Sequence, residues 1–139
     1  MITAVDTSVL LDILIDGSSF MAQSEFQLRD FREMSDLIVC EAVIAEIRPV
    51  FSNDQHLIDF LQDLQIEFTP SSIKTILLAG SMYAEYISNK GPSKRVLPDF
   101  MIGAHALQQA DILLARDRGY YCEYFKDLKL VDPALCGDE

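Results

Sequence analysis

Basic residues are scarce in this sequence. The 139 residues include 11 Lys and Arg against 22 Asp and Glu, which gives a formal net charge of −11 at pH 7. A protein that holds nucleic acid through a broad basic face needs the opposite balance, so the charge argues against such a face. The cations beside two of the acids discussed below can steer phosphates locally, although each taken singly also fits an ordinary solvated surface. They are Lys90, Lys94, Arg95, Arg116 and Arg118.

Long apolar runs and paired cysteines are also missing. No apolar run approaches the ~20 residues needed to cross a bilayer, because charged residues such as Asp12, Glu46 and Asp59 interrupt each candidate. No basic stretch precedes an apolar one near the N-terminus, so we expect no signal peptide. The 3 cysteines show no Cys-x-x-Cys spacing, which is typical of reduced thiols rather than of a disulfide framework. We therefore expect a cytoplasmic protein without a membrane partner.

Short apolar runs alternate with helical patterns along the chain. The length and the 50% share of hydrophobic residues suit a single domain, residues 1–139, with one buried core. The runs lack the alternation of half-exposed strands, so they predict a parallel sheet covered on both faces, an α/β fold. Strands are predicted at residues 2–6, 36–40, 112–115 and 128–132. Helices are predicted at residues 8–15, 22–34, 41–51, 54–64, 72–89 and 98–110. Their expected N-caps are Thr7 or Ser8, Ser52 or Asn53, and Ser71 or Ser72.

Four carboxylates stand where small or apolar residues are usual: Asp6, Glu46, Asp99 and Asp117. Asp6 and Asp117 end predicted strands, and ligands of open parallel sheets collect beyond the carboxyl ends of strands. Clustered carboxylates repel each other and lose hydration, so a cluster is tolerated mainly when a bound cation neutralises it. Hard oxygen ligands select Mg²⁺ or Mn²⁺, which indicates phosphate chemistry. Each acid alone also fits a structural role, as a cap, a first-turn residue or a turn residue.

The sequence resembles the PIN-domain ribonucleases, most closely the VapC-type toxins of prokaryotic toxin–antitoxin pairs. The likeness spans nearly the whole chain and rests on four stretches: VDTSVLLD at residues 5–12, IAEI at 44–47, RVLPDFMIGAHA continuing into ADILLARDR at 95–118, and FKDLKLVDP at 125–133. The resemblance implies a PIN-like three-layer α/β/α sandwich with a central parallel sheet, and endonucleolytic RNA cleavage dependent on Mg²⁺ or Mn²⁺. It also implies a homodimer and a cognate antitoxin protein.

The resemblance places the family's catalytic acids on Asp6, Glu46, Asp99 and Asp117. We assign Asp6 and Asp99 as the closest metal ligands, Asp117 as a ligand of the metal or its water, and Glu46 as the acid that orients or deprotonates the attacking water. Three departures leave open whether one or two ions bind. Ala115 stands where the family often has Thr or Ser, Gly119 where many members have a further acid, and Ser8 where others have Asn.

Other side chains near these acids have more than one interpretation. The hydroxyls of Thr7 and Ser8 can contact water or phosphate, or cap the helix. Tyr120, Tyr121 and Tyr124 could stack on bases, but packing at the helix–sheet edge is the more common role of such residues. His105 lies six positions after Asp99 and points away from it, as a packing or surface residue.

Glu41 and Glu46 share one predicted helix but face about 140° apart on the helical wheel, so only one of them can serve the site. Glu46 lies between apolar neighbours, where an unpaired charge is costly, whereas Glu41 opens the helix and is expected to face water.

Three alternatives come from other classes, and the residues speak against the first two. A phosphoaspartyl phosphatase needs a second acid where Ser8 stands, and a receiver domain needs a late lysine better placed than Lys126 or Lys129. The third alternative is a non-catalytic PIN-like module that binds RNA or protein without cutting.

Overall fold

The computed structural model describes residues 1–90, 97–116 and 120–136. One parallel sheet has the strand order β3-β2-β1-β4-β5. The strands are β1 (Ile2–Val5), β2 (Asp36–Val39), β3 (Ile66–Phe68), β4 (Ile112–Leu114) and β5 (Leu130–Val131). The helices are α1 (Thr7–Leu14), α2 (Met21–Met34), α3 (Glu41–Ile47), α4 (Asp54–Asp63), α5 (Ile73–Lys90), α6 (Leu97–Gln109), α7 (Tyr120–Tyr124) and α8 (Pro133–Cys136).

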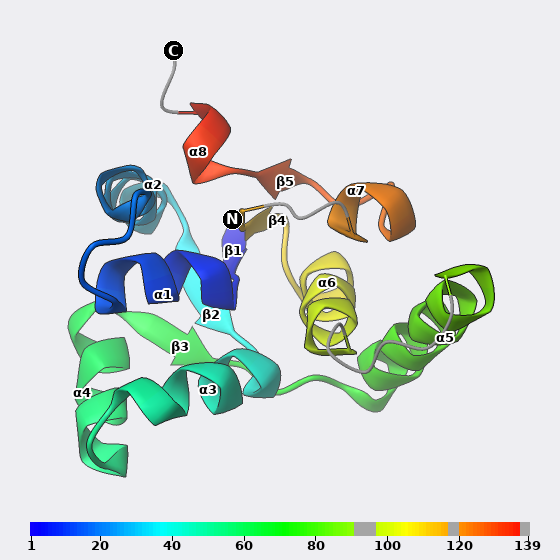
Figure 1. The fold of residues 1–139 in the computed structure, drawn as a ribbon, viewed down its shortest axis with the longest axis horizontal. Coiled ribbons are helices and arrows are strands. Elements are labelled where there is room, and N and C mark those ends of the chain that lie inside the picture. Colours follow the sequence, from blue (N-terminus) through cyan, green and yellow to red (C-terminus); the bar gives the residue numbers. More distant parts are fainter. Residues whose placement is uncertain (91–96, 117–119, 137–139) are drawn as a thin grey trace.

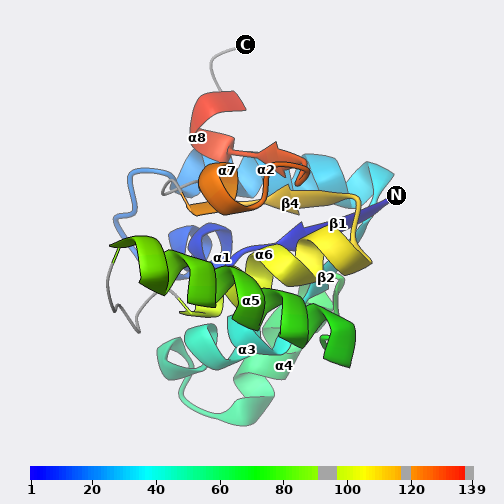
Figure 2. The ribbon, with the colours of Figure 1, turned by 90° about the vertical axis from the view of Figure 1, so that its right-hand side faces the viewer.

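Helices cover both faces of the sheet. In Figure 1, α1 and α2 lie on one side of the strands, and α5 and α6 lie on the other. Figure 2 shows α6 between the sheet and α5, which forms the outer layer of that side. This arrangement confirms the predicted α/β/α sandwich with a central parallel sheet. None of the helices in the described ranges is long and apolar enough to span a membrane.

The predicted elements agree with most of the structure. Four of the five strands and six of the helices follow the predicted segments within a few residues. The predicted helix 41–51 is shorter, because α3 ends at Ile47 and a 3₁₀ turn, Arg48–Val50, continues it through Pro49. Strand β3 was missed, since only Ile66 of its three residues is buried and the apolar signal is weak. Helices α7 and α8 were missed because they are short.

The helix caps differ in part from the expected ones. Asp6 caps α1 by accepting a hydrogen bond from the backbone N–H of Ser8 at 3.0 Å, so neither Thr7 nor Ser8 is the cap. Asn53 caps α4 by accepting from His56 N at 2.9 Å. Ser72 precedes α5, and its hydroxyl accepts from Thr75 N at 3.1 Å.

The core lies between the sheet and its two helical layers. The central strands bury their apolar side chains almost completely, and Leu113 and Val39 are 0% exposed. On the α6 side, Phe100 is the centre of a group of aromatic rings that also includes Tyr83, Tyr86, Tyr124 and Phe125. A Cβ at Gly103 would lie 2.6 Å from Cε2 of Phe125, so this position of α6 needs glycine for the close approach of the ring.

The strand order reverses beside β1, which pairs with β2 on one side and with β4 on the other. Val5 and Leu114 are register partners at the carboxyl ends of β1 and β4, and Asp6 N donates to Leu114 O at 2.9 Å. The chain continues from β1 toward β2 and from β4 toward β5, which lie on opposite sides of this point in the sheet. Ligands of open parallel sheets usually bind at such a point. The fold therefore carries Asp6 to this switch point.

Candidate active site at the ends of β1 and β4

Asp6 is buried at the carboxyl end of β1, with 5% of its surface exposed. Its Oδ2 accepts hydrogen bonds from Ser8 N at 3.0 Å and from the Ser8 hydroxyl. Its Oδ1 accepts from the hydroxyl of Tyr121 at 2.8 Å. A buried carboxylate needs such donors because burial removes its hydration. Residues from α1 and α7 therefore hold this carboxylate in one orientation.

The Ser8 hydroxyl joins Asp6 to the end of β4. Its oxygen accepts a hydrogen bond from the backbone N–H of Arg116 at 3.1 Å while its proton goes to Asp6. This bond decides the direction of the chain of hydrogen bonds, which runs from Arg116 through Ser8 to the carboxylate. Ser8 thus links β1 and β4 beyond the last bond of the sheet.

The pKa of Tyr121 responds to three of the predicted acids. This phenol on α7 is 4% exposed, and its burial raises its pKa well above the ordinary value. The negative charges of Asp6, Asp99 and Glu46 raise the pKa further. Asp6 follows β1, Asp99 lies on α6 and Glu46 lies on α3, so negative charge from three parts of the fold acts on one phenol. The convergence of Asp6, Glu46 and Asp99 on one metal site stays a prediction.

Glu46 lies near Asp6 for a different reason from the one expected. Its side chain is exposed, so the apolar neighbours in sequence do not bury its charge. Its Oε1 accepts a hydrogen bond of 2.6 Å from the Thr7 hydroxyl, which comes directly after Asp6. The helix α3 contacts both α1 and α6, and this packing turns Glu46 toward the start of α1. The burial argument for Glu46 is wrong, while its position beside Asp6 is as expected.

The comparisons with known proteins agree with this geometry. The PIN domain family model matches residues 3–124 of the chain. The chain belongs to the PIN-domain family. PIN domains are generally nucleases, and such nucleases generally use divalent metals. No curated protein matches the chain by sequence.

Several solved structures share this PIN fold. VapBC2 of Rickettsia felis, solved bound to a DNA fragment from its promoter, has a TM-score of 0.72 at 18% identity, with 95% of this chain and 98% of that chain covered. FitAcB of Neisseria gonorrhoeae has a TM-score of 0.66 at 18% identity, with 96% and 99% covered. VapBC-1 of nontypeable Haemophilus influenzae has a TM-score of 0.67 at 18% identity, also with 96% and 99% covered. At these identities the likeness shows the fold.

Arg116 does not face the acids of the PIN site with its side chain. Its guanidinium donates from Nε and Nη2 to the two carboxylate oxygens of Asp12, at 2.8 and 2.9 Å. It also lies 4.5 Å above the ring of Phe20. The hydroxyls of Ser18 and Ser24 also donate hydrogen bonds to the carboxylate of Asp12, which is 3% exposed. This geometry corrects the phosphate-steering role expected for Arg116, because a bidentate pair with a buried carboxylate holds the guanidinium in place.

Asp117 lies outside the described residues, and so do Lys94, Arg95, Arg118 and Gly119. Sequence places Asp117 directly after Arg116, whose backbone is tied to Ser8. Within the described ranges, no group of three or more His, Cys, Asp or Glu side chains is close enough together to hold a metal ion. The assignment of Asp6, Asp99 and Asp117 as metal ligands stays a prediction.

Glu41 and His105 serve the packing of the PIN domain at another place. Glu41 accepts a hydrogen bond from Ser71 N at 2.9 Å. Partial burial is the largest single effect on the pKa of Glu41 and raises it, but the hydrogen bonds from Ser71 and from the Glu41 backbone, with the smaller effects, lower the pKa on balance. His105 is 1% exposed and pairs through Nε2 with Thr69 O at 2.8 Å, as expected of a packing residue. Its burial lowers its pKa, which keeps the imidazole neutral at pH 7. Glu41 is bound to a loop rather than free in water.

Proposed function

We propose that this PIN domain is a Mg²⁺- or Mn²⁺-dependent endoribonuclease and the toxin of a toxin–antitoxin pair. The observation that carries the proposal is the buried carboxylate of Asp6 at the switch point of the sheet, with Glu46 hydrogen-bonded to Thr7, the next residue along the chain. Acids held this way repel one another unless a cation lies among them. The PIN family assignment supports nuclease chemistry at this site, and RNA as the substrate is part of the proposal.

The donor set fits a hard divalent ion. The predicted ligands offer carboxylate oxygens, whereas Cys40 and His105, a thiol and an imidazole, are both buried elsewhere in the described core. Asp6 and Asp99 would hold the ion, with Asp117 as the third ligand. The bound ion would lower the pKa of a water molecule and neutralise charge on the phosphoryl oxygens.

Side chains of the protein would accept the proton and orient the acids. Glu46 is exposed, and the Thr7 hydroxyl binds its Oε1, not its Oε2. Oε2 can therefore accept the proton of the attacking water. Thr7 orients Glu46, and Ser8 orients Asp6. Because Tyr121 keeps its proton, it acts as a hydrogen-bond donor and not as a nucleophile or base.

Cleavage of structured RNA is expected only when Mn²⁺ or Mg²⁺ is present. Protein freed of metal with a chelator should leave the RNA intact, and added Mn²⁺ should restore cleavage. Melting of the same preparation provides the control: ion at ten times its dissociation constant should add about 1.4 kcal/mol to the free energy of unfolding by mass action. Stabilisation by Mn²⁺ with RNA binding but no cleavage would favour the non-catalytic module. An unchanged melting temperature across millimolar Mn²⁺ would count against the metal site.

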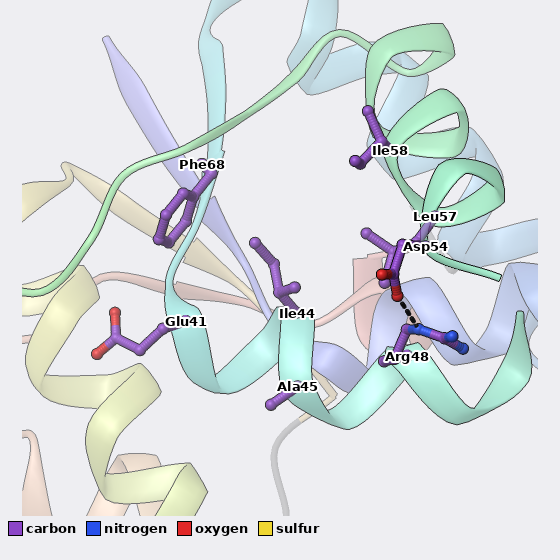
Figure 3. A pocket seen from close by; sticks show the side chains of 8 residues that line it. All are labelled: Glu41, Ile44, Ala45, Arg48, Asp54, Leu57, Ile58 and Phe68. Carbon is purple, nitrogen blue, oxygen red and sulfur yellow. Dashed lines mark hydrogen bonds and ion pairs between the residues drawn. The ribbon is translucent and has the colours of Figure 1, made fainter.

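We also propose a cognate antitoxin as the protein partner. An open apolar groove of about 490 Å³ lies between α3, α4 and β3. Figure 3 shows Ile44, Ile58 and Phe68 around the same space, with Glu41 at one end and the ion pair of Arg48 and Asp54 at the other. A groove of this kind suits the apolar face of a helix. The VapBC structures named above support such a partner, and the net charge of −11 favours a basic one.

Ile58→Glu is expected to weaken antitoxin binding by at least about tenfold while leaving RNA cleavage unchanged. Ile58 is 44% exposed at the groove, so a charge there meets the apolar face of the partner at little cost to folding. Phe26→Glu is the matched control, because Phe26 is 64% exposed on α2, away from the groove. Binding is measured by titration with the product of the neighbouring gene. Equal binding by wild type and both variants would remove the groove as the docking site.

A homodimer and a cytoplasmic location complete the proposal. Helix α5 forms the outer layer of its side of the molecule and exposes Ile73, Ile76 and Leu77 by 71%, 45% and 64%. Three exposed apolar side chains within two turns of a helix are typical of a contact surface. This face is the one we propose for the second copy.

A further inference from the structure

Tyr121 is a buried side chain that contacts a predicted metal ligand and that sequence analysis did not assign to metal binding. Its ring packs in the core, with 4% exposure, while its hydroxyl crosses from α7 to Asp6 at 2.8 Å. A carboxylate can only accept, so the phenol donates this hydrogen bond. The contact joins residues that are 115 positions apart in sequence.

The acceptor positions of Asp6 can be counted. A carboxylate offers about four lone-pair positions, two on each oxygen. Oδ2 receives two donors from Ser8, its N–H and its hydroxyl, which uses both positions. Among the described residues, Oδ1 receives one donor, from Tyr121. One lone pair of Oδ1 is therefore left for any further partner.

We propose that Tyr121 is a positioning residue that orients Asp6 so that a single lone pair of Oδ1 faces the metal ion. This inference rests on the proposed function. Ser8 holds one edge of the carboxylate and Tyr121 holds the other, which prevents rotation about the Cβ–Cγ bond. Asp6 then binds an ion through one oxygen, a mode that suits the octahedral shell of Mg²⁺ or Mn²⁺ better than a bidentate contact. Hydrogen-bond partners of this kind set the affinity of many metal sites.

Tyr121→Phe tests the role with the loss of one oxygen atom. The variant keeps the ring and its packing but frees one edge of Asp6. We expect its dissociation constant for Mn²⁺, measured by calorimetric titration on folded protein, to rise about 10- to 100-fold, the usual effect of losing a partner of a metal ligand. A merely structural role would change the melting temperature of the metal-free protein and leave the Mn²⁺ affinity alone.

Tyr124→Phe is the matched control. Tyr124 lies on the same short helix and is also buried, but its hydroxyl has no hydrogen-bond partner among the described residues. The same chemical change should leave Mn²⁺ affinity within about twofold of wild type, because no ligand of the site loses a partner. Ser8→Ala provides a second variant: it removes the hydroxyl donor on Oδ2 and should also weaken Mn²⁺ binding.

The outcomes separate this inference from the proposed function. If wild-type protein binds no Mn²⁺, the metal site itself fails. If wild type binds Mn²⁺ and Tyr121→Phe binds it equally well, the site survives and the positioning role of Tyr121 is overturned. Equal losses in Tyr121→Phe and Tyr124→Phe would also overturn the role, since the effect would then belong to α7 as a whole. Weaker binding in Tyr121→Phe and Ser8→Ala, with Tyr124→Phe unchanged, supports it.

Discussion

Asp99→Asn is expected to abolish RNA cleavage. Asp99 lies half buried in the first turn of α6, and its negative charge raises the pKa of Tyr121. Asparagine keeps the size and the helix position but has no charge, so it cannot neutralise a divalent ion in the same way. Single-turnover cleavage of a labelled RNA measures the loss. Asp30→Asn on α2, where the side chain is exposed, is the control and should cleave like wild type.

Asp6→Asn should lose cleavage as well, but with an additional cost in stability. The Asp6 carboxylate accepts from three donors, and an amide has only one oxygen to offer them. Losing hydrogen bonds to a charged group costs about 1.5–3 kcal/mol, which exceeds the gain from relieved repulsion. Cleavage and melting are measured on the same preparation. Full activity in both the Asp6 and the Asp99 variant would end the nuclease proposal.

Glu46→Gln is expected to lower the cleavage rate at least about a hundredfold, the usual scale for a positioned acid–base group. Glutamine still accepts the Thr7 hydrogen bond through Oε1, so the side chain keeps its place and loses only its basicity. Because the Glu46 side chain is exposed, the folded protein should be about as stable as wild type. The measurement is the single-turnover rate under saturating Mn²⁺.

Glu41→Gln is the matched control on the same helix. It should cleave near the wild-type rate, because Glu41 is bound to Ser71 and borders the apolar groove. The lowered pKa of Glu41 adds stability that is present at neutral pH and is lost as pH falls through the folded pKa. Glu41→Gln should therefore reduce the stability difference between pH 7 and pH 4. The reverse ranking of the two glutamates would place the catalytic face on the other side of α3.

The alternation of apolar runs and helical patterns was enough to predict the sheet. Strands such as β1 and β4 are buried on both faces, so their runs are continuously apolar and can be recognised locally. Strand β3 could not be recognised in this way, because two of its three residues are exposed at the edge of the sheet. Gln65, which precedes it with a φ of 58°, gave no turn signal because the left-handed conformation usually belongs to glycine.

The acids proposed for the site were selected by residue type and position, and the structure supports only part of the reasoning. Asp6 stands at the end of a buried strand, and parallel strands bring such ends to one edge. Glu46 was selected for a burial that it does not have, and only the packing of α3 beside α1 turns it toward Thr7. A helical wheel shows which residues share a face but not which neighbour covers that face.

The sequence by itself determined the layers, the strands with buried faces and the acids that mark the switch point, because these follow from local periodicity and residue chemistry. Only the tertiary structure decided the partners of those acids. Tyr121 meets Asp6 across 115 positions, and Arg116 pairs with Asp12 across 104. No local pattern carries such contacts, since they depend on how α7 and the end of β4 are placed against α1. For the same reason a tyrosine expected to pack donates a hydrogen bond to Asp6, and an arginine expected to attract phosphate is paired with a buried carboxylate.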